Sequence, residues 1–328
     1  MRILYLIGNG LDIAHHMDTS YDKFFDHYVK VPSSDDDIIR MKADIQKHKY
    51  TTWADLEIGL GEYSSSCDNK DVFLKCVRNM KEELRKYLEK ESEKIKLYLA
   101  PSFGEYLTFP EKILEPDPQQ RFWTYVAPRQ IDRINIITFN YTKTLEFLSG
   151  YSGPPIVVHG NTLLESIHHL HGTLDSMMVM GVNDPSQIKN NEFNTDEDVD
   201  EDFIKPEFND ACLNRKNIIC EDLIRNANII VIYGLSVGPS DDKWWKMIGE
   251  RMESQNYPLL IYLPYDGQKD VKTYPNFMRK WTKGYIREIR EKFGIFIPEA
   301  ELEKRVCVGI NKTLFPLTKN GAVILPKA

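Results

Sequence analysis

The sequence predicts an α/β protein: a mostly parallel sheet flanked by helices, with a large helical insertion after the first strand. Short, uninterrupted apolar runs such as ILYLI at residues 3–7 and NIIVIYG at 228–234 are typical of buried parallel strands. Segments with helical periodicity separate these runs, as crossover connections in a parallel sheet require. We therefore expect a single elaborated domain over residues 1–328, with a helical insertion or subdomain at 21–128.

The individual elements follow in order along the chain. After the first strand, residues 21 to about 125 carry helical periodicity, and 71–100 is the clearest long helix. Further strands are expected at 134–140, 156–160, 167–172, 178–183, 228–234, 258–266 and 305–311. Helices are expected at 242–252 and 285–294, and the acidic run TDEDVDED at 195–202 predicts a flexible loop over 190–205.

Composition narrows the class of protein. The chain has 328 residues with 42 Lys and Arg against 49 Asp and Glu, so its net charge of -7 disfavours a duplex DNA binder. No apolar run approaches the length of a membrane span, so none is expected. The five cysteines are scattered and form no C-x-x-C pair, which favours a reducing, cytoplasmic setting and argues against a four-cysteine zinc site.

Ligands of parallel α/β sheets bind beyond the carboxyl ends of the strands, so the residues after each strand are the candidate site. Gly8-Asn9-Gly10-Leu11-Asp12 follows the first strand, and glycines there allow close approach to a phosphate at a helix N-terminus. The dinucleotide fingerprint would place a third glycine where Ile13 stands, which weakens the case for an ordinary dehydrogenase. The alternative is a plain turn into a helix that Asp12 caps.

Two later strand ends carry an amide and a histidine. Asn140 either caps a helix or holds a hydroxyl or a water with its amide. His171 lies in the run HHLHG, and histidine is the side chain best suited to proton transfer near neutral pH. The alternative is a buried, hydrogen-bonded ring. His169 and His171 could supply two metal ligands but no third is evident, so no metal is expected.

The run Gly234-Leu235-Ser236-Val237-Gly238 matches the G-x-S-x-G nucleophile elbow of α/β-hydrolases. That fold places its histidine after the serine in the chain, whereas all eight histidines here lie at or before residue 171. Ser236 therefore fits better as a hydrogen-bond donor to a ligand, with the glycines granting access.

Taken together, these strand-end segments resemble the bacteriophage abortive-infection AbiH family. The matching stretches are IGNGLDIAHHMDTSYDKF, WADLE at 53–57, ITFNYTKTLE at 137–146, HLHG at 169–172 and YGLSVGPSDDKWW at 233–245. They occur in family order over about three quarters of the chain. Two departures are His16-Met17-Asp18, where the family tends to have Gly-Leu-Pro, and Leu235, where it often has His.

The AbiH pattern itself looks like the Rossmann-like core of sirtuins, which binds NAD. This resemblance implies that Gly8, Asn9, Gly10 and Asp12 form the dinucleotide loop. It also matches Thr138 and Asn140 to a Thr-x-Asn segment, His171 to the His-Gly element, and Gly234 and Ser236 to a serine loop near the cofactor. In that family the Asn and His act at the nicotinamide ribose, so Asn140 and His171 become the candidate catalytic residues.

Three functional classes remain open. The first is an antiphage enzyme that hydrolyses NAD and releases nicotinamide, since the chain lacks the zinc module of sirtuin deacylases. The second is a nucleotide sensor without turnover, and the third is a metal-dependent nuclease or phosphohydrolase. Partners implied are a nucleotide, a phage-derived trigger or a second defence protein, and a homo-oligomer is a further expectation. We also expect the WADLE segment, with Asp55 and Glu57, to lean over the pocket.

Overall fold

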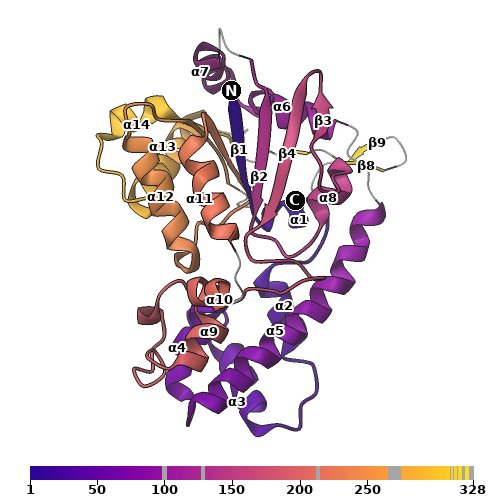
Figure 1. Cartoon of the computed structure of the whole chain (residues 1–328), viewed down its shortest axis with the longest axis vertical. Coiled ribbons are helices and arrows are strands. Elements are labelled where there is room, and N and C mark those ends of the chain that lie inside the picture. Colours follow the sequence, from indigo (N-terminus) through magenta and orange to yellow (C-terminus); the bar gives the residue numbers. More distant parts are fainter. Residues whose placement is uncertain are drawn as a thin grey trace.

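A seven-stranded sheet, in the upper part of the molecule in Figure 1, organises the fold. The structure is a computed structural model, and it describes residues 1–97, 102–126, 130–211, 215–264, 275–310, 312, 314–315, 317–319 and 322–324. The strands are β1 (Arg2–Ile7), β2 (Arg133–Thr138), β3 (Ile156–His159), β4 (Thr162–His169), β5 (Ile229–Tyr233), β6 (Leu259–Leu263) and β7 (Val306–Val308). A separate hairpin consists of β8 (Leu317–Lys319) and β9 (Ala322–Ile324).

The sheet has the order β3-β4-β2-β1-β5-β6-β7, and every neighbouring pair is parallel except β3 with β4. The prediction of a mostly parallel sheet is therefore confirmed. From the central β1 the chain builds β2 and β4 on one side, then crosses back to build β5, β6 and β7 on the other. Such a reversal opens a crevice at the carboxyl ends of the two central strands, β1 and β5.

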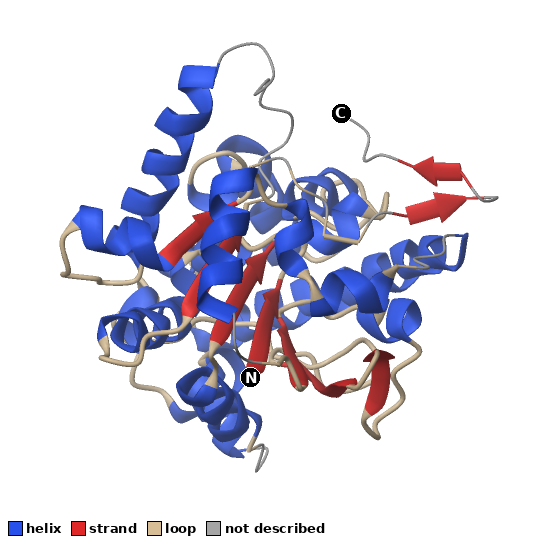
Figure 2. Ribbon diagram, turned by 90° about the horizontal axis from the view of Figure 1, so that it is seen from above, coloured by secondary structure: helices blue, strands red, loops and turns tan. Residues whose placement is uncertain are grey.

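The central strands are buried on both faces because their side chains alternate between two separate cores. Ile3, Tyr5 and Ile7 of β1 join the core that is covered by α6 (Phe103–Thr108), α7 (Pro116–Val126) and α8 (Thr144–Ser149). Leu4 and Leu6 join the opposite core. That core is covered by α11 (Lys216–Asn226), α12 (Asp242–Glu253), α13 (Pro275–Lys292) and α14 (Glu299–Arg305). Figure 2 shows the strands between these two helical layers.

The remaining helices form a second body below the sheet in Figure 1, which we call the helical lobe. It contains α2 (Tyr21–Tyr28), α3 (Asp36–His48), α4 (Leu56–Tyr63), α5 (Lys70–Ser92), α9 (Glu197–Phe203) and α10 (Lys205–Ala211). Its core joins residues from two distant parts of the sequence, for example Trp53 and Phe73 with Phe193 and Phe203. The short helix α1 (Gly10–Ala14) leads from β1 towards this lobe.

The insertion expected at 21–128 is thus divided between two structural units. Its first part, up to the end of α5, packs in the helical lobe, whereas α6 and α7 pack on the sheet. The long helix expected at 71–100 is α5, which ends at Ser92 and continues as a short 3-10 turn over Glu93–Leu97. The last residues of that prediction, and residues 127 and 128 of the insertion, lie outside the described residues, as do 265, 266 and 311 of two predicted strands.

Two predictions from the sequence are wrong. The acidic segment expected as a loop at 190–205 contains helix α9, because Val199 and Phe203 lie one turn apart and are buried in the lobe while Glu197, Asp198 and Glu201 are exposed. Asp196 caps this helix and pairs with Lys70 of α5. Residues 178–183 form no strand: Met178, Met180 and Val182 are buried, but they pack in the helical lobe, and only an isolated bridge from Val182 to Ile204 is formed.

Within the described residues, no helix combines the length and the apolar character needed to span a bilayer. Four cysteines, Cys67, Cys76, Cys220 and Cys307, are buried free thiols.

Candidate functional site

A cavity of about 400 Å³ lies between the carboxyl edge of the sheet and the helical lobe. One wall comes from the segments that follow β1, β2, β4 and β5, and the other comes from α2, α4 and α5. Its position is the crevice that the strand order creates between β1 and β5. Its size falls within the roughly 300–1,000 Å³ of typical small-molecule sites.

The strand-end residues singled out in the sequence do converge here. Gly10, Asn140, His171 and Ser236 all line the cavity, although they are up to 226 residues apart in sequence. Asn9, Asp12 and Gly234 line it as well. Gly8 and Thr138 do not line it, and both are buried. Each has a structural role: Gly8 lies against Leu235, and the hydroxyl of Thr138 accepts the backbone amide of Asn140.

The glycines after β1 and β5 serve the packing of the two loops. A Cβ on Gly8 would overlap the side chain of Leu235, and one on Gly234, whose φ is +63°, would lie 2.7 Å from the Cα of Gly10. The amides of Gly8, Gly10 and Leu11 donate to the carbonyls of Tyr233, Gly234 and Gly8 respectively. The loop is thus closed by its own hydrogen bonds, and these three amides are not free to cradle a phosphate.

Asn9 and Asp12 hold neighbouring segments in place at the cavity wall. The side-chain amide of Asn9 donates to the backbone carbonyl of Thr19 at 2.8 Å, and its oxygen accepts the hydroxyl of Thr19. These two bonds fix the chain that enters α2. The carboxylate of Asp12 accepts the hydroxyls of Thr142 and Thr144 at 2.6 and 2.7 Å. Burial raises the pKa of Asp12 to about 6, an effect that these two hydrogen bonds oppose.

Asn140 is fixed from three directions. Its side-chain amide donates to the carbonyl of Gly8 at 3.1 Å, and its backbone amide donates to the hydroxyl of Thr138 at 3.2 Å. Its carbonyl lies 2.8 Å from Nδ1 of His169, whose other ring nitrogen pairs with Glu146 at 2.7 Å. His169 therefore positions Asn140 and does not itself line the cavity.

His171 is paired with a buried carboxylate that the sequence had not revealed. Its Nε2 lies 3.0 Å from Oδ1 of Asp241, the last residue of the 3-10 turn Pro239–Asp241. A carboxylate at Nε2 fixes the proton on that nitrogen and leaves Nδ1, for which no described protein atom is a partner, as an acceptor. The ring is held edge-on against Phe139, with the centroids 5.5 Å apart.

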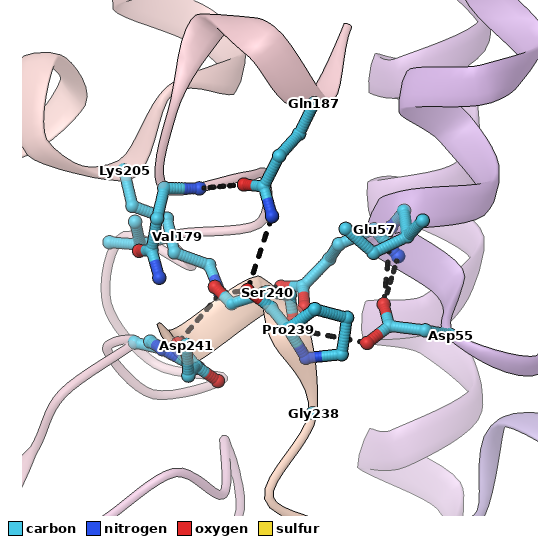
Figure 3. A network of polar contacts seen from close by, with 12 residues as sticks. Asp55, Glu57, Val179, Gln187, Lys205, Gly238, Pro239, Ser240 and Asp241 are labelled. Carbon is cyan, nitrogen blue, oxygen red and sulfur yellow. Dashed lines mark hydrogen bonds and ion pairs between the residues drawn. The ribbon is translucent and has the colours of Figure 1, made fainter. Parts of the chain in front are cut away.

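Lys205 of α10 completes a charged network that joins the helical lobe to the sheet (Figure 3). Its Nζ lies 2.9 Å from Oδ1 of Asp241, donates to the carbonyl of Ser240 at 3.0 Å, and lies 3.3 Å from Oε1 of Glu57. Burial would raise the pKa of Asp241, but Lys205 and His171 outweigh it and hold that pKa well below its usual range. Burial raises the pKa of Glu57, and Lys205 opposes this rise.

The cavity is acidic and partly aromatic. Five carboxylates line it, whereas no lysine or arginine of the described part of the chain does; the five are Asp12, Asp22, Asp55, Glu57 and Asp241. Its aromatic lining consists of Tyr21, Phe139, Tyr141 and Trp245.

A family model described as bacteriophage abortive infection AbiH matches residues 4–262, which include every residue that lines the cavity. The chain belongs to the AbiH family. Membership implies a role in the abortive infection response to bacteriophage. No curated protein matches the chain.

In this AbiH-family chain, the sequence pointed to His171 but not to Asp241, the carboxylate paired with it. Asp241 stands inside the stretch YGLSVGPSDDKWW that carries the AbiH resemblance, so its position was a usable signal. Lys205 stands in no matching stretch and gave none. The expectation that the WADLE segment leans over the pocket is confirmed for Asp55 and Glu57, which line the cavity, whereas Trp53 is buried in the core of the lobe.

The AbiH cavity offers no evident metal site. Across the described ranges, no group of three or more His, Cys, Asp or Glu side chains has the arrangement needed to hold a metal ion. His169 and His171 face different partners, Glu146 and Asp241, and do not converge on one point.

Proposed function

We propose that this AbiH-family protein is an antiphage enzyme that binds NAD and hydrolyses its N-glycosidic bond, releasing nicotinamide. The observation that carries the proposal is the cavity at the β1–β5 crevice, where His171 is held by Asp241 beside the fixed amide of Asn140. In the proposed reaction they supply the general base and the orienting amide that attack of water on a sugar carbon requires.

Support for a dinucleotide comes from the sheet. Numbered along the chain, its six parallel strands have the order 3-2-1-4-5-6, which is the order of Rossmann dinucleotide-binding sheets. Together with the sirtuin-like motif order, this favours NAD over other nucleotides.

The acidic lining supports a substrate whose reacting group is cationic. The nicotinamide ring of NAD is positively charged, and the transition state of N-glycoside cleavage places positive charge on the ribose. Carboxylates around that position favour both cations. In the proposed reaction Asn140 orients a water, His171 accepts its proton at Nδ1, and Asp241 stabilises the resulting imidazolium.

The phosphates of NAD require a different holder from the one the glycines first suggested, because the amides of Gly8, Gly10 and Leu11 are already bonded. Ser236 is exposed where it lines the cavity, and the Nζ of Lys292 lies 3.3 Å from its carbonyl oxygen. This rim offers a hydroxyl and a nearby cation. We place the pyrophosphate here and the nicotinamide riboside half inside the cavity.

A product survey tests the proposal. The purified protein is incubated with NAD, ATP and single-stranded DNA, with and without EDTA and with lysate of phage-infected cells as a source of trigger. Release of nicotinamide and ADP-ribose that EDTA does not affect is the expected result. Binding of NAD without any product would favour a sensor, and cleavage of ATP or DNA that EDTA abolishes would favour the metal-dependent enzyme.

A further inference from the structure

Glu57 is one of the cavity carboxylates that have no role in the proposed reaction so far. It is the second residue of α4 and comes from the helical lobe, on the wall opposite the strand ends. Its exposed fraction is 3 %, so its carboxylate is almost completely removed from bulk water.

The carboxylate of Glu57 is unusually short of donors for a buried group. Among the described residues no hydrogen bond to either oxygen is formed, and Oε1 is fully buried without a hydrogen-bond partner. Its one cation is Lys205 at 3.3 Å, which it shares with Asp241. Buried carboxylates in proteins normally accept several hydrogen bonds, so such a deficit calls for an explanation.

Other carboxylates of the same cavity do not share this deficit. Asp12 accepts two threonine hydroxyls, and Asp55 accepts two backbone amides and the hydroxyl of Ser240. Asp241 is paired with His171 and Lys205. Of these four buried or half-buried acids, Glu57 therefore has the most charge left to offer to a group inside the cavity.

The two carboxylates that share Lys205, those of Glu57 and Asp241, also have pKa values shifted in opposite directions. The pKa of Glu57 is raised, with burial as the largest cause, whereas the pKa of Asp241 is held low by Lys205 and His171. Two acids whose surroundings push their pKa values apart are a recurring mark of divided catalytic roles. Here Asp241 serves His171, and Glu57 is left to serve the ligand.

We propose that Glu57 is a catalytic residue whose carboxylate faces the sugar carbon that becomes cationic as the N-glycosidic bond breaks. This rests on the proposed function. The bond between the anomeric carbon and the ring nitrogen breaks, and both its electrons pass to nicotinamide, which leaves neutral. The oxygen of water bonds to the carbon, and its proton passes to His171 and then to solvent. Glu57 stays ionised throughout, with Lys205 favouring its charged form.

The test compares Glu57→Gln with Glu62→Gln. Glu62 lies on the same helix, is exposed, and pairs with Lys189 at 3.5 Å, so its replacement removes an equal charge outside the cavity. We expect Glu57→Gln to lower kcat for nicotinamide release by roughly 10²–10³ and to raise the KM for NAD by about tenfold, since the carboxylate stabilises the transition state most but also attracts the cationic ring of bound NAD. Glu62→Gln should match wild type, and circular dichroism checks that both variants fold.

A binding measurement gives a second readout that does not depend on turnover. Nicotinamide riboside, which is cationic, and its neutral dihydro form are titrated into the resting proteins. Wild type should prefer the cation by about tenfold or more, and Glu57→Gln should lose that preference.

The outcomes separate this inference from the proposed function. Wild type that releases nicotinamide, with Glu57→Gln within threefold of it and an unchanged preference for the cation, overturns the role of Glu57 alone. Wild type that releases no nicotinamide under any condition overturns the proposed hydrolysis and, with it, this role. In that case a cation preference that Glu57→Gln abolishes would show only that Glu57 contacts a ligand.

Discussion

Replacing Asp241 with Asn should destabilise the protein much more than the same change at its neighbour, Asp242. One oxygen of Asp241 contacts Nζ of Lys205 at 2.9 Å and Nε2 of His171 at 3.0 Å, and the side chain is only 13 % exposed. Removing one partner of a buried charge pair costs about 3–5 kcal/mol when the other charge is stranded. Because Lys205 keeps Glu57 as a counter-ion, we expect a smaller loss, about 2–3 kcal/mol.

Asp242 is the matched control. Its side chain is 39 % exposed and pairs with Lys246 one turn further along α12. Exposed pairs of this kind contribute about 0–1 kcal/mol, so Asp242→Asn should change the free energy of unfolding by less than that. The assay is urea unfolding of wild type and both variants at pH 7, followed by tryptophan fluorescence and circular dichroism.

The pH dependence of the stability difference between wild type and Asp241→Asn is an independent check on the contribution of the Asp241 charge. Because the pKa of Asp241 is lower in the folded state than in the unfolded state, its contribution is complete above the unfolded pKa of about 3.9. It is lost as the pH falls through the lower, folded value. The gap between wild type and Asp241→Asn should therefore be constant from pH 5 to 8 and shrink below about pH 4. Equal stability of the Asp241 and Asp242 variants at pH 7 would refute the reasoning.

Three further predictions concern other parts of the fold. Burial raises the pKa of Glu111 to about 7, and both its carboxylate oxygens lack a hydrogen-bond partner among the described residues. Ionised Glu111 therefore destabilises the folded state increasingly as the pH rises from about 4.5 to 7. In denaturant titrations the stability of Glu111→Gln relative to wild type should increase by about 1–3 kcal/mol between pH 5 and pH 8, and a constant difference would contradict this. Gly234→Ala should lower the stability measured by thermal unfolding more than Gly150→Ala does, because both glycines have φ near +65° but only Gly234 has neighbouring atoms where a Cβ would lie. Equal losses of about 1–2 kcal/mol would show that the structure relieves this crowding. Thr142→Val should raise the pKa of Asp12 above about 6 in a carbon-detected NMR titration, since the lost hydroxyl favours the ionised form, and an unchanged pKa would mean that this hydrogen bond is not formed.

The strands were predictable because burial on both faces leaves a simple signature. β1, β5 and β6 are apolar at nearly every position, and the sequence shows each as a short unbroken run; β2 contains the polar residues Asn135 and Thr138 but is buried after its first residue. Helix α9 was not predicted because its acidic composition suggested a solvated loop, although its two buried apolar residues, Val199 and Phe203, have helical spacing. Residues 178–183 have the apolar character of a strand, but their partner is the core of the helical lobe and not another strand.

Half of the site followed from one rule, that residues after neighbouring parallel strands meet at one edge of the sheet. This rule places Asn140 and His171 together and says nothing about residues from other elements. Lys205 reaches Asp241 from α10, 34 positions after His171 and within a helix of the other lobe, and Glu57 lines the cavity from α4. Only the packing of the helical lobe against the sheet brings Lys205 into contact with Asp241 and Glu57 to the cavity, and no local pattern encodes that packing.

The glycines after β1 show a motif that the sequence reveals without revealing its role. Gly8 and Gly10 have the spacing of a phosphate loop, yet their amides are bonded to the carbonyls of Tyr233, the last residue of β5, and Gly234, which follows it. The sequence shows that the backbone must be approached closely at this point, but not whether a ligand or another segment of the chain makes the approach.

The most direct test of the central claim is the NAD content of phage-infected cells that express the protein. Wild type is compared with His171→Ala and with His168→Ala, a neighbouring histidine on β4 that does not line the cavity. Our account predicts that NAD falls and nicotinamide rises after infection with wild type and His168→Ala, and that His171→Ala slows this by roughly 10²–10⁴. NAD that remains constant in infected wild-type cells undergoing abortive infection, or that falls equally fast with His171→Ala, would contradict it.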